Sequence, residues 1–162
     1  MFLLSLNSPS YRADPVLPGA LTREDLRAGM DAQYAKSITD TDADGCPDVK
    51  ESLLAPNTDP SDPWDFYSVP TPALFAAPNP LNVFKDATVS PGDAQAVFAY
   101  FTVGAQTGTP EYEQDRNANG IKDGLEYDRS VAGPAKSGAP DGVITASDAQ
   151  LAFAQFKFAY HC

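Results

Sequence analysis

The sequence predicts a mainly α-helical protein with long irregular loops, in which acidic loops and short helices occur as two related copies. The first observation is a repeat: SPGDAQAVFAYF at 90–101 returns as TASDAQLAFAQF at 145–156. The second is a pair of acidic loops, DTDADGCPDVKE at 40–51 and DRNANGIKDGLE at 115–126, which carry oxygen-bearing side chains at matching places. The third is the proline-rich connector between residues 56 and 80, whose composition favours an extended chain wrapped over the surface.

These repeats divide the 162 residues into an N-terminal arm and two units that together form one domain. We assign residues 1–20 to the arm, 21–102 to the first loop-and-helix unit with its connector, and 103–162 to the second unit. The arm opens with MFLLSL, which is shorter than a signal peptide and lacks its basic start. It is therefore either a disordered terminus or an apolar arm that docks on the body or on a neighbouring subunit.

The first predicted helix runs from about Arg23 to Lys36 and leads into the first acidic loop. Thr22 followed by Asp25 resembles a capping box, and acidic side chains favour the first turn of a helix. Its apolar residues fall on one stripe: Leu26, Met30 and Tyr34.

Both acidic loops place oxygen-bearing side chains at the spacing that a 12-residue EF-hand loop uses to bind Ca²⁺. Such a loop supplies oxygens from positions 1, 3, 5, 7, 9 and 12, with a backbone carbonyl at position 7 and glycine at position 6. The ligands expected in the first loop are Asp40, Asp42, Asp44, the Cys46 carbonyl, Asp48 and Glu51. Those expected in the second are Asp115, Asn117, Asn119, the Ile121 carbonyl, Asp123 and Glu126. The second loop carries less charge, so we expect it to bind Ca²⁺ more weakly.

Two shorter acidic segments precede the repeated helices and resemble incomplete loops. They keep Asp86 with Asp93 and Asp141 with Asp148 but lack the first two ligands. A carboxylate from elsewhere could complete each site, with Asp65 and Asp128 as the candidates, which would raise the number of Ca²⁺ ions from two to four. The alternative is that the aspartates at the helix starts only cap their helices.

The connector and the repeated helices carry the apolar residues expected to form the core. Four aromatic residues are expected to pin the connector to the body: Trp64, Phe66, Tyr67 and Phe75. Each repeated helix has an apolar face with i, i+3, i+4, i+7 spacing, which predicts a core contact rather than a ligand site. These faces consist of Ala94, Val97, Phe98 and Phe101, and of Ala149, Ala152, Phe153 and Phe156. The shorter connector, RSVAGPAKSGAP, is expected to be a loop.

The composition limits the function classes. A net charge of −11 argues against nucleic acids and anionic membrane surfaces as partners and favours cations. Two Ca²⁺ ions would bring the formal charge to −7. The single histidine, His161, and the absence of a nucleophile motif such as GxSxG argue against an enzyme.

The two cysteines, Cys46 and Cys162, have no metal-binding spacing. In a secreted protein they would form a disulfide, which would stabilise the fold by roughly 4–5 kcal/mol through loop-closure entropy. Free thiols or bridges between chains are the alternatives.

At these motifs the chain resembles two families. DTDADGCPDVKE is similar to a thrombospondin type 3 repeat, and DGVITASDAQLAFAQF is similar to half of a type I dockerin, whose Ca²⁺ loop runs directly into a helix. The resemblance covers residues 40–162 and implies secretion, Ca²⁺-dependent folding and a role in attachment or assembly. Pro91-Gly92 and Ala146-Ser147 stand where dockerins recognise a cohesin partner, and the first pair lacks the usual hydroxyls.

The sequence therefore predicts an extracellular Ca²⁺-binding structural module that assembles with copies of itself or attaches to a cell-surface protein. A filament, tube or layer would suit such a subunit. The alternative is a dockerin-like module that binds a different protein. In either case Ca²⁺ would couple binding to folding, because it neutralises clustered carboxylates.

Overall fold

The computed structural model describes residues 39–51, 53 and 58–160. The chain divides into two units, Met1–Tyr34 and Ala35–Cys162, and all the described residues belong to the second unit. The predicted arm at residues 1–20 and the predicted helix at 23–36 lie outside the described residues. Both acidic loops and both repeated helices fall within the one compact unit.

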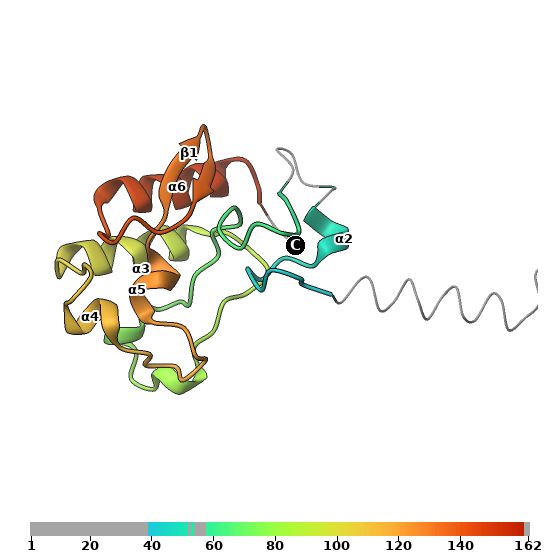
Figure 1. Ribbon diagram of the computed structural model, residues 1–162. Coiled ribbons are helices and arrows are strands. Elements are labelled where there is room, and N and C mark those ends of the chain that lie inside the picture. Colours follow the sequence, from blue (N-terminus) through green and yellow to red (C-terminus); the bar gives the residue numbers. More distant parts are fainter. Residues whose placement is uncertain (1–38, 52, 54–57, 161–162) are drawn as a thin grey trace, which may run out of the picture. The chain divides into compact units, whose positions relative to one another are not determined.

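The described elements are short helices joined by long irregular segments and one hairpin (Figure 1). The α-helices are α2 (Asp48–Glu51), α3 (Pro91–Thr102), α4 (Pro110–Glu113), α5 (Asp123–Tyr127) and α6 (Ala146–Lys157). Two 3₁₀ turns, Leu74–Ala76 and Pro80–Asn82, lie between α2 and α3. None of the helices in the described part of the chain has the length and apolar character needed to cross a membrane.

The two repeated helices, α3 and α6, begin with the same capping box. The Ser90 hydroxyl accepts a hydrogen bond from the Gly92 amide, and the Asp93 carboxylate accepts one from the Ser90 amide. Thr145 and Asp148 repeat this arrangement at the start of α6. Because both caps satisfy amides that have no partner inside the helix, they fix where each helix begins.

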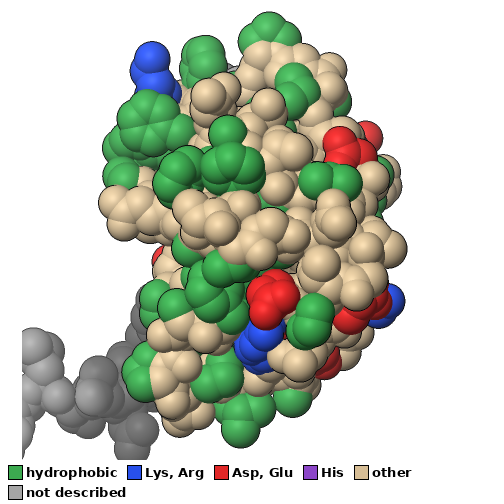
Figure 2. Space-filling model, turned by 90° about the vertical axis from the view of Figure 1, so that its left-hand side faces the viewer, with side chains coloured by type: hydrophobic (Ala, Val, Ile, Leu, Met, Phe, Trp, Pro, Cys, Tyr) green, Lys and Arg blue, Asp and Glu red, His purple; other side chains and the backbone are tan. Residues whose placement is uncertain are grey.

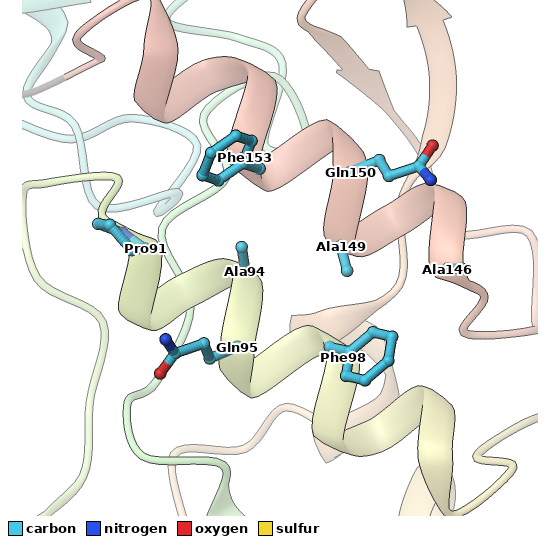
Figure 3. A pocket seen from close by; sticks show the side chains of 8 residues that line it. All are labelled: Pro91, Ala94, Gln95, Phe98, Ala146, Ala149, Gln150 and Phe153. Atoms are coloured by element: carbon cyan, nitrogen blue, oxygen red, sulfur yellow. The ribbon is translucent and has the colours of Figure 1, made fainter.

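The helices α3 and α6 pack antiparallel against each other (Figures 1 and 3). Backbone hydrogen bonds link the start of each helix to the end of the other. The Val89 amide donates to the Tyr160 carbonyl over 3.0 Å, and the Ile144 amide donates to the Ala105 carbonyl over 3.1 Å. Since Val89 and Ile144 occupy equivalent places in the repeat, as do Ala105 and Tyr160, the two repeated helices and their flanking residues are related by an approximate twofold axis.

The predicted inner faces of these helices are only partly right: Val97, Ala149 and Ala152 are buried as expected, but the four phenylalanines are exposed because the buried stripe is shifted by about one residue. The buried stripe of α3 is Asp93, Ala96, Val97 and Tyr100, and that of α6 includes Asp148, Leu151, Ala152 and Gln155. The buried aspartates explain the shift. Asp93 accepts a hydrogen bond from the Val69 amide and Asp148 accepts one from the Arg129 amide, so both must point inward. A shift of one residue rotates a helix by about 100°, which turns the repeated phenylalanines outward.

The connector is held in the core by aromatic side chains and their hydroxyl groups. Phe66 and Tyr67 are fully buried, and the Tyr67 hydroxyl donates to the Tyr127 carbonyl over 2.6 Å. Tyr127 in turn stacks on Tyr100 with ring centroids 4.1 Å apart. Phe75 packs edge-on against Tyr100, so the connector contributes to the main core as expected.

The shorter connector is a β-hairpin, not the loop expected from its sequence. Strand β1 (Ser130–Gly133) pairs antiparallel with β2 (Lys136–Gly138), with an irregularity between Val131 and Gly133. Ala135 adopts a positive φ of 56° in the turn. The sequence did not predict these strands because the segment is rich in proline and glycine. The two strands also lack an alternating apolar pattern, since their one buried residue is Ser137.

Candidate metal centre

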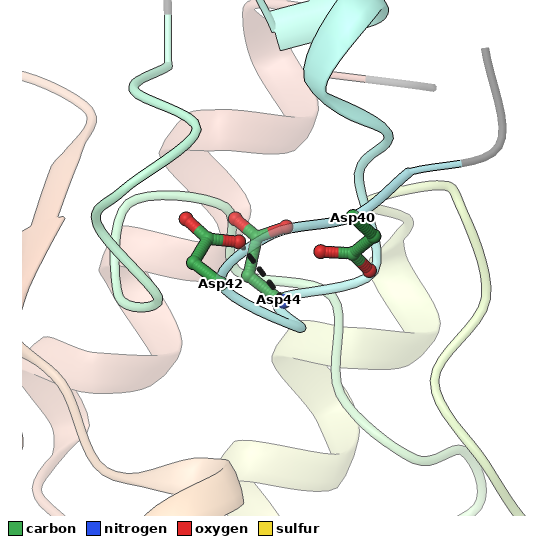
Figure 4. Close-up of side chains that lie close together, drawn as sticks. All are labelled: Asp40, Asp42 and Asp44. Carbon is green, nitrogen blue, oxygen red and sulfur yellow. Dashed lines mark hydrogen bonds between the residues drawn. The ribbon is translucent and has the colours of Figure 1, made fainter. Parts of the chain in front are cut away.

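The first acidic loop curls so that the side chains of Asp40, Asp42 and Asp44 come together (Figure 4). Ala43 and Gly45 adopt positive φ values of 61° and 105°, which reverse the chain tightly. The Gly45 amide donates to Asp40 Oδ2 over 3.1 Å, and the Cys46 amide donates to Asp44 Oδ1 over 2.7 Å. One oxygen of each carboxylate therefore holds the backbone, and the other remains available.

Six carboxylate oxygens from five residues are buried here and accept no hydrogen bond within the described part of the chain. They are Asp40 Oδ1, Asp42 Oδ2, Asp44 Oδ2, Glu51 Oε1, Glu51 Oε2 and Asp65 Oδ1. Ligand atoms of Asp40, Asp42 and Asp44 lie within 4.8 Å of one another, as do those of Asp44, Glu51 and Asp65. Ca²⁺ lies about 2.3–2.6 Å from each of its oxygens, so oxygens on opposite sides of one ion are about 5 Å apart. The residues present therefore fit a metal ion.

Asp65 comes from the connector and joins the first complete loop, whereas the sequence placed it beside an incomplete loop. Its Oδ2 accepts a hydrogen bond from the Asp59 amide over 2.6 Å. Its backbone carbonyl accepts one from Gln155 Nε2 over 2.7 Å. Gln155 also accepts a hydrogen bond from the Tyr67 amide, so α6 fixes the connector where Asp65 meets the loop.

Burial and mutual repulsion both raise the pKa values of four carboxyl groups in this cluster. Burial is the largest cause of the rise in the pKa of Asp44 to about 8, with further contributions from Asp42, Glu51 and Asp65. Burial also raises the pKa of Glu51 to about 7, with repulsion from Asp42 and Asp65 adding to it. The pKa values of Asp42 and Asp65 rise to about 6, again chiefly through burial. A bound cation would offset both effects.

Two predicted ligands of the first loop have other surroundings. Asp48 lies outside the inward-facing cluster, because its two oxygens accept hydrogen bonds from the amide and the hydroxyl of Thr41 over 2.8 and 2.7 Å. These hydrogen bonds lower the pKa of Asp48. The residue at position 9 of an EF-hand loop often binds the ion through a water molecule, which agrees with the position of Asp48 outside the cluster. Cys46 has a buried side chain in a small cluster with Phe66, and its carbonyl stays a predicted ligand.

The second acidic loop has the same backbone as the first. Ala118 and Gly120 adopt positive φ values of 56° and 88° at the places of Ala43 and Gly45. The Gly120 amide donates to Asp115 Oδ2 over 2.9 Å, and the Ile121 amide donates to Asn119 Oδ1 over 2.9 Å. These hydrogen bonds reproduce those of the first loop, so the repeat in the sequence reflects a repeat in the structure.

The side chains of the second loop are more fully satisfied than those of the first. Asp123 forms an ion pair with Arg116 and accepts a hydrogen bond from the Tyr100 hydroxyl over 3.0 Å. Glu126 Oε1 accepts hydrogen bonds from Asn119 Nδ2 and Asn117 Nδ2 over 2.8 and 3.4 Å. Buried oxygens without a hydrogen bond are Asn117 Oδ1 and Glu126 Oε2. A metal ion at this loop would require the two amides to rotate and present their oxygens, a free-energy cost that the first loop does not have.

The carboxylates of the incomplete loops hold backbone amides. Besides their inward hydrogen bonds, Asp93 and Asp148 cap α3 and α6, which supports the capping alternative. Asp86 and Asp141 accept hydrogen bonds from the amides two residues later, those of Thr88 and Val143. Asp128 accepts hydrogen bonds from the Tyr112 hydroxyl and from the amides of Asp141 and Gly142. Among the described residues, each cluster of three acidic side chains that could hold a metal ion includes Asp44.

Two cations that the sequence did not single out lie near the loops. Arg129 is 2% exposed, and its guanidinium lies 4.8 Å from the centre of the Trp64 ring. Burial lowers the pKa of Arg129, whereas Asp128, Asp44 and Glu126 oppose this change. Burial and Arg129 also lower the pKa of Lys85, against opposing effects of Glu126, Asp44 and Asp40. Both cations interact with acidic groups of both loops, a long-range relation that no local motif reveals.

The two loops face a shared groove of about 400 Å³, lined by Asp42 and Ala43 on one side and by Gly120 and Ile121 on the other.

Comparisons with protein-family models, with curated protein sequences and with solved structures found no match. The description of this chain as a metal-binding module therefore depends on the geometry of its own loops.

Proposed function

We propose that this chain is a Ca²⁺-binding structural module in which the ion clamps the proline-rich connector to the first acidic loop. The observation that carries the proposal is the set of six buried carboxylate oxygens without hydrogen bonds. Four of the five residues come from the loop and its short helix, and Asp65 comes from the connector. An ion held by all five would tie the connector to the first loop.

The donor set favours Ca²⁺ over other common metal ions. All six oxygens are carboxylate oxygens, which suit hard cations such as Ca²⁺ and Mg²⁺ rather than Zn²⁺. Glu51 offers both of its oxygens, as the last ligand of a Ca²⁺ loop does. Mg²⁺ usually keeps several waters and needs stricter octahedral geometry. A site that supplies six protein oxygens therefore favours Ca²⁺.

The second loop is proposed to hold a second, weaker Ca²⁺ ion. It repeats the backbone of the first loop but offers asparagine amides at positions 3 and 5, and its Asp123 is already paired with Arg116. The proposed total of two ions leaves out the incomplete loops, because their aspartates already accept hydrogen bonds from backbone amides. Extracellular Ca²⁺ modules commonly have dissociation constants of roughly 10⁻⁴–10⁻³ M, and we expect the second loop to lie in this range.

The same proposal places the protein outside the cell, where Ca²⁺ is abundant and a Cys46–Cys162 disulfide could form. Cys46 is buried, whereas Cys162 lies outside the described residues. The resemblance of the loops to dockerins and thrombospondin type 3 repeats supports a role in assembly or attachment. We propose a subunit that assembles with its own copies or attaches to a surface protein. A dockerin-like module that binds a different protein is the second candidate, favoured by the paired helices α3 and α6.

Thermal unfolding tests the metal assignment. The protein is freed of metal with a chelator and melted alone, with Ca²⁺ and with Mg²⁺ at the same concentration. We expect a large rise in melting temperature with Ca²⁺ and a smaller one with Mg²⁺, because ligand binding to the folded state stabilises it. A melting temperature that neither ion changes would contradict the proposal.

A further inference from the structure

The helices α3 and α6 enclose an apolar groove of about 450 Å³ on the outside of the molecule (Figure 3). Its lining consists of four pairs of residues, and the members of each pair hold equivalent places in the repeat: Pro91 and Ala146, Ala94 and Ala149, Gln95 and Gln150, Phe98 and Phe153. Phe98 projects next to Ala149, and Phe153 projects next to Ala94 (Figure 3). The groove thus looks nearly the same after half a turn.

The aromatic side chains beside the groove confirm this symmetry. Phe98 and Phe101 have ring centroids 5.5 Å apart with an interplanar angle of 52°. Phe153 and Phe156 repeat the pair at 5.7 Å and 47°. All four are substantially exposed, with Phe98 at 49% and Phe153 at 47%. Since the core is filled mainly by the neighbouring faces of both helices, these phenylalanines form the exposed part of each apolar face.

The groove also lacks the negative charge that dominates the rest of the sequence. The chain has 22 acidic residues, yet the only carboxylates on α3 and α6 are Asp93 and Asp148, which are buried. The polar side chains that line the groove are the amides of Gln95 and Gln150. An amide both donates and accepts hydrogen bonds, so it can pair with an identical amide. Figure 2 shows a face of the molecule on which hydrophobic side chains are widespread and charged ones are sparse.

We infer that this groove, the α3/α6 face, is the surface through which two copies of the chain associate. In a twofold dimer the same patch is used by both subunits, so it must be complementary to itself. A patch that already has internal twofold symmetry can place each phenylalanine against an equivalent environment in the partner. Two molecules with a net charge of −11 can also approach through it without bringing exposed carboxylates together.

The exposed area is sufficient for a modest dimer. A phenylalanine has about 200 Å² to bury, so the four phenylalanines at 38–49% exposure contribute roughly 350 Å² per copy. Two copies would bury about 700 Å² from these rings alone, and the rest of the groove brings the total near the roughly 1,000 Å² at which specific interfaces begin. We therefore expect a dimer that forms at micromolar concentration. This inference specifies the self-assembly in the proposed function and rests on it.

Sedimentation equilibrium of the full chain in Ca²⁺ over a range of concentrations tests the inference. We expect the mass to rise from that of one 17.2 kDa chain toward twice that value. The variant Phe98→Asp/Phe153→Asp should raise the dimer dissociation constant at least 30-fold, the effect of losing an interface hot spot. Each single variant should have a similar, smaller effect, because the two positions are equivalent. The matched control is Phe84→Asp, at a phenylalanine of 56% exposure outside the groove, which should leave the dimer unchanged.

Three results would overturn the inference: a wild type that stays monomeric, a double variant that dimerises as the wild type does, or an equal effect of the control. If the wild type stays monomeric, the groove would instead be the binding surface for a different protein. Melting of the same variants with and without Ca²⁺ separates the two proposals. If Ca²⁺ stabilises the double variant as much as the wild type, the metal site is independent of the interface. If Ca²⁺ stabilises none of them, the metal proposal fails regardless of dimerisation.

Discussion

Replacing Glu51 by glutamine should have opposite effects on stability in the presence and absence of Ca²⁺. The side chain is fully buried, both of its oxygens lack hydrogen bonds, and repulsion from Asp42 and Asp65 adds to the burial that raises its pKa to about 7. Glutamine keeps the size of the side chain but removes the charge and one ligand oxygen. In Ca²⁺ the variant loses a ligand, whereas without metal it loses a source of repulsion.

The expected magnitude follows from the linkage between binding and folding. At a Ca²⁺ concentration 100 times the dissociation constant, a site stabilises the fold by about 2.7 kcal/mol. If the substitution weakens binding about 100-fold, the remaining stabilisation is about 0.4 kcal/mol, a loss of about 2.3 kcal/mol. For a unit of this size, a loss of 1 kcal/mol lowers the melting temperature by about 3–5 °C. The variant should therefore melt about 7–12 °C lower than the wild type in Ca²⁺.

Differential scanning calorimetry at pH 8 in Ca²⁺ and in EDTA measures both effects. In EDTA the variant should melt at the same temperature as the wild type or above it. The control Glu111→Gln, which makes the same chemical change outside the cluster, should have little effect in either buffer. An equal loss of stability in both buffers would refute the reasoning, because it would show that Glu51 stabilises the fold without a metal ion.

Four further predictions follow from the same geometry. Asp65→Asn should weaken Ca²⁺ binding at the first loop about 10-fold, measured by calorimetric titration, and should speed hydrogen exchange in the connector; unchanged affinity would exclude Asp65 as a ligand. Glu126→Gln should reduce the number of bound ions from two to one in equilibrium dialysis, whereas a site lost from the first loop instead would reverse the assignment. Without metal, the protein should lose stability as the pH rises from about 5 to 8 in urea unfolding, since the folded-state pKa of Asp44, about 8, lies above its ordinary value and protonation favours the fold; a rise in stability over that range would contradict this. Non-reducing peptide mapping should find Cys46 linked to Cys162, and two free thiols would refute the disulfide.

The acidic loops could be predicted from the sequence because their ligands are close together along the chain. The spacing from Asp40 to Glu51 is local, and the folded loop brings four of its predicted ligands together. Asp65 was predicted as a ligand, but the sequence did not show that it joins the first loop. Which loop it reaches depends on how Gln155 and the core fix the connector. No local pattern could reveal the long-range position of Lys85 between the two loops.

The orientation of the repeated helices shows a second limit. The spacing of Phe98 and Phe153 predicted an inner face, and the buried face lies one residue earlier. An apolar stripe at helical spacing identifies a helix but leaves two neighbouring faces nearly equivalent when both are apolar. Asp93 and Asp148 decide between them, because each must reach a backbone amide from another segment. The capping alternative concerned only the start of each helix, and the additional hydrogen bond across the core is what fixes the rotation of the helix.

The most direct test of the central claim is a crystal structure of the protein grown in Ca²⁺. We predict an ion in the first loop with carboxylate oxygens of Asp40, Asp42, Asp44, Glu51 and Asp65 about 2.3–2.6 Å away, identified by its anomalous signal. Asp65 bound to the same ion as the loop would establish that the metal clamps the connector. A first loop that holds only water, with its carboxyl groups bonded to one another, would contradict the account.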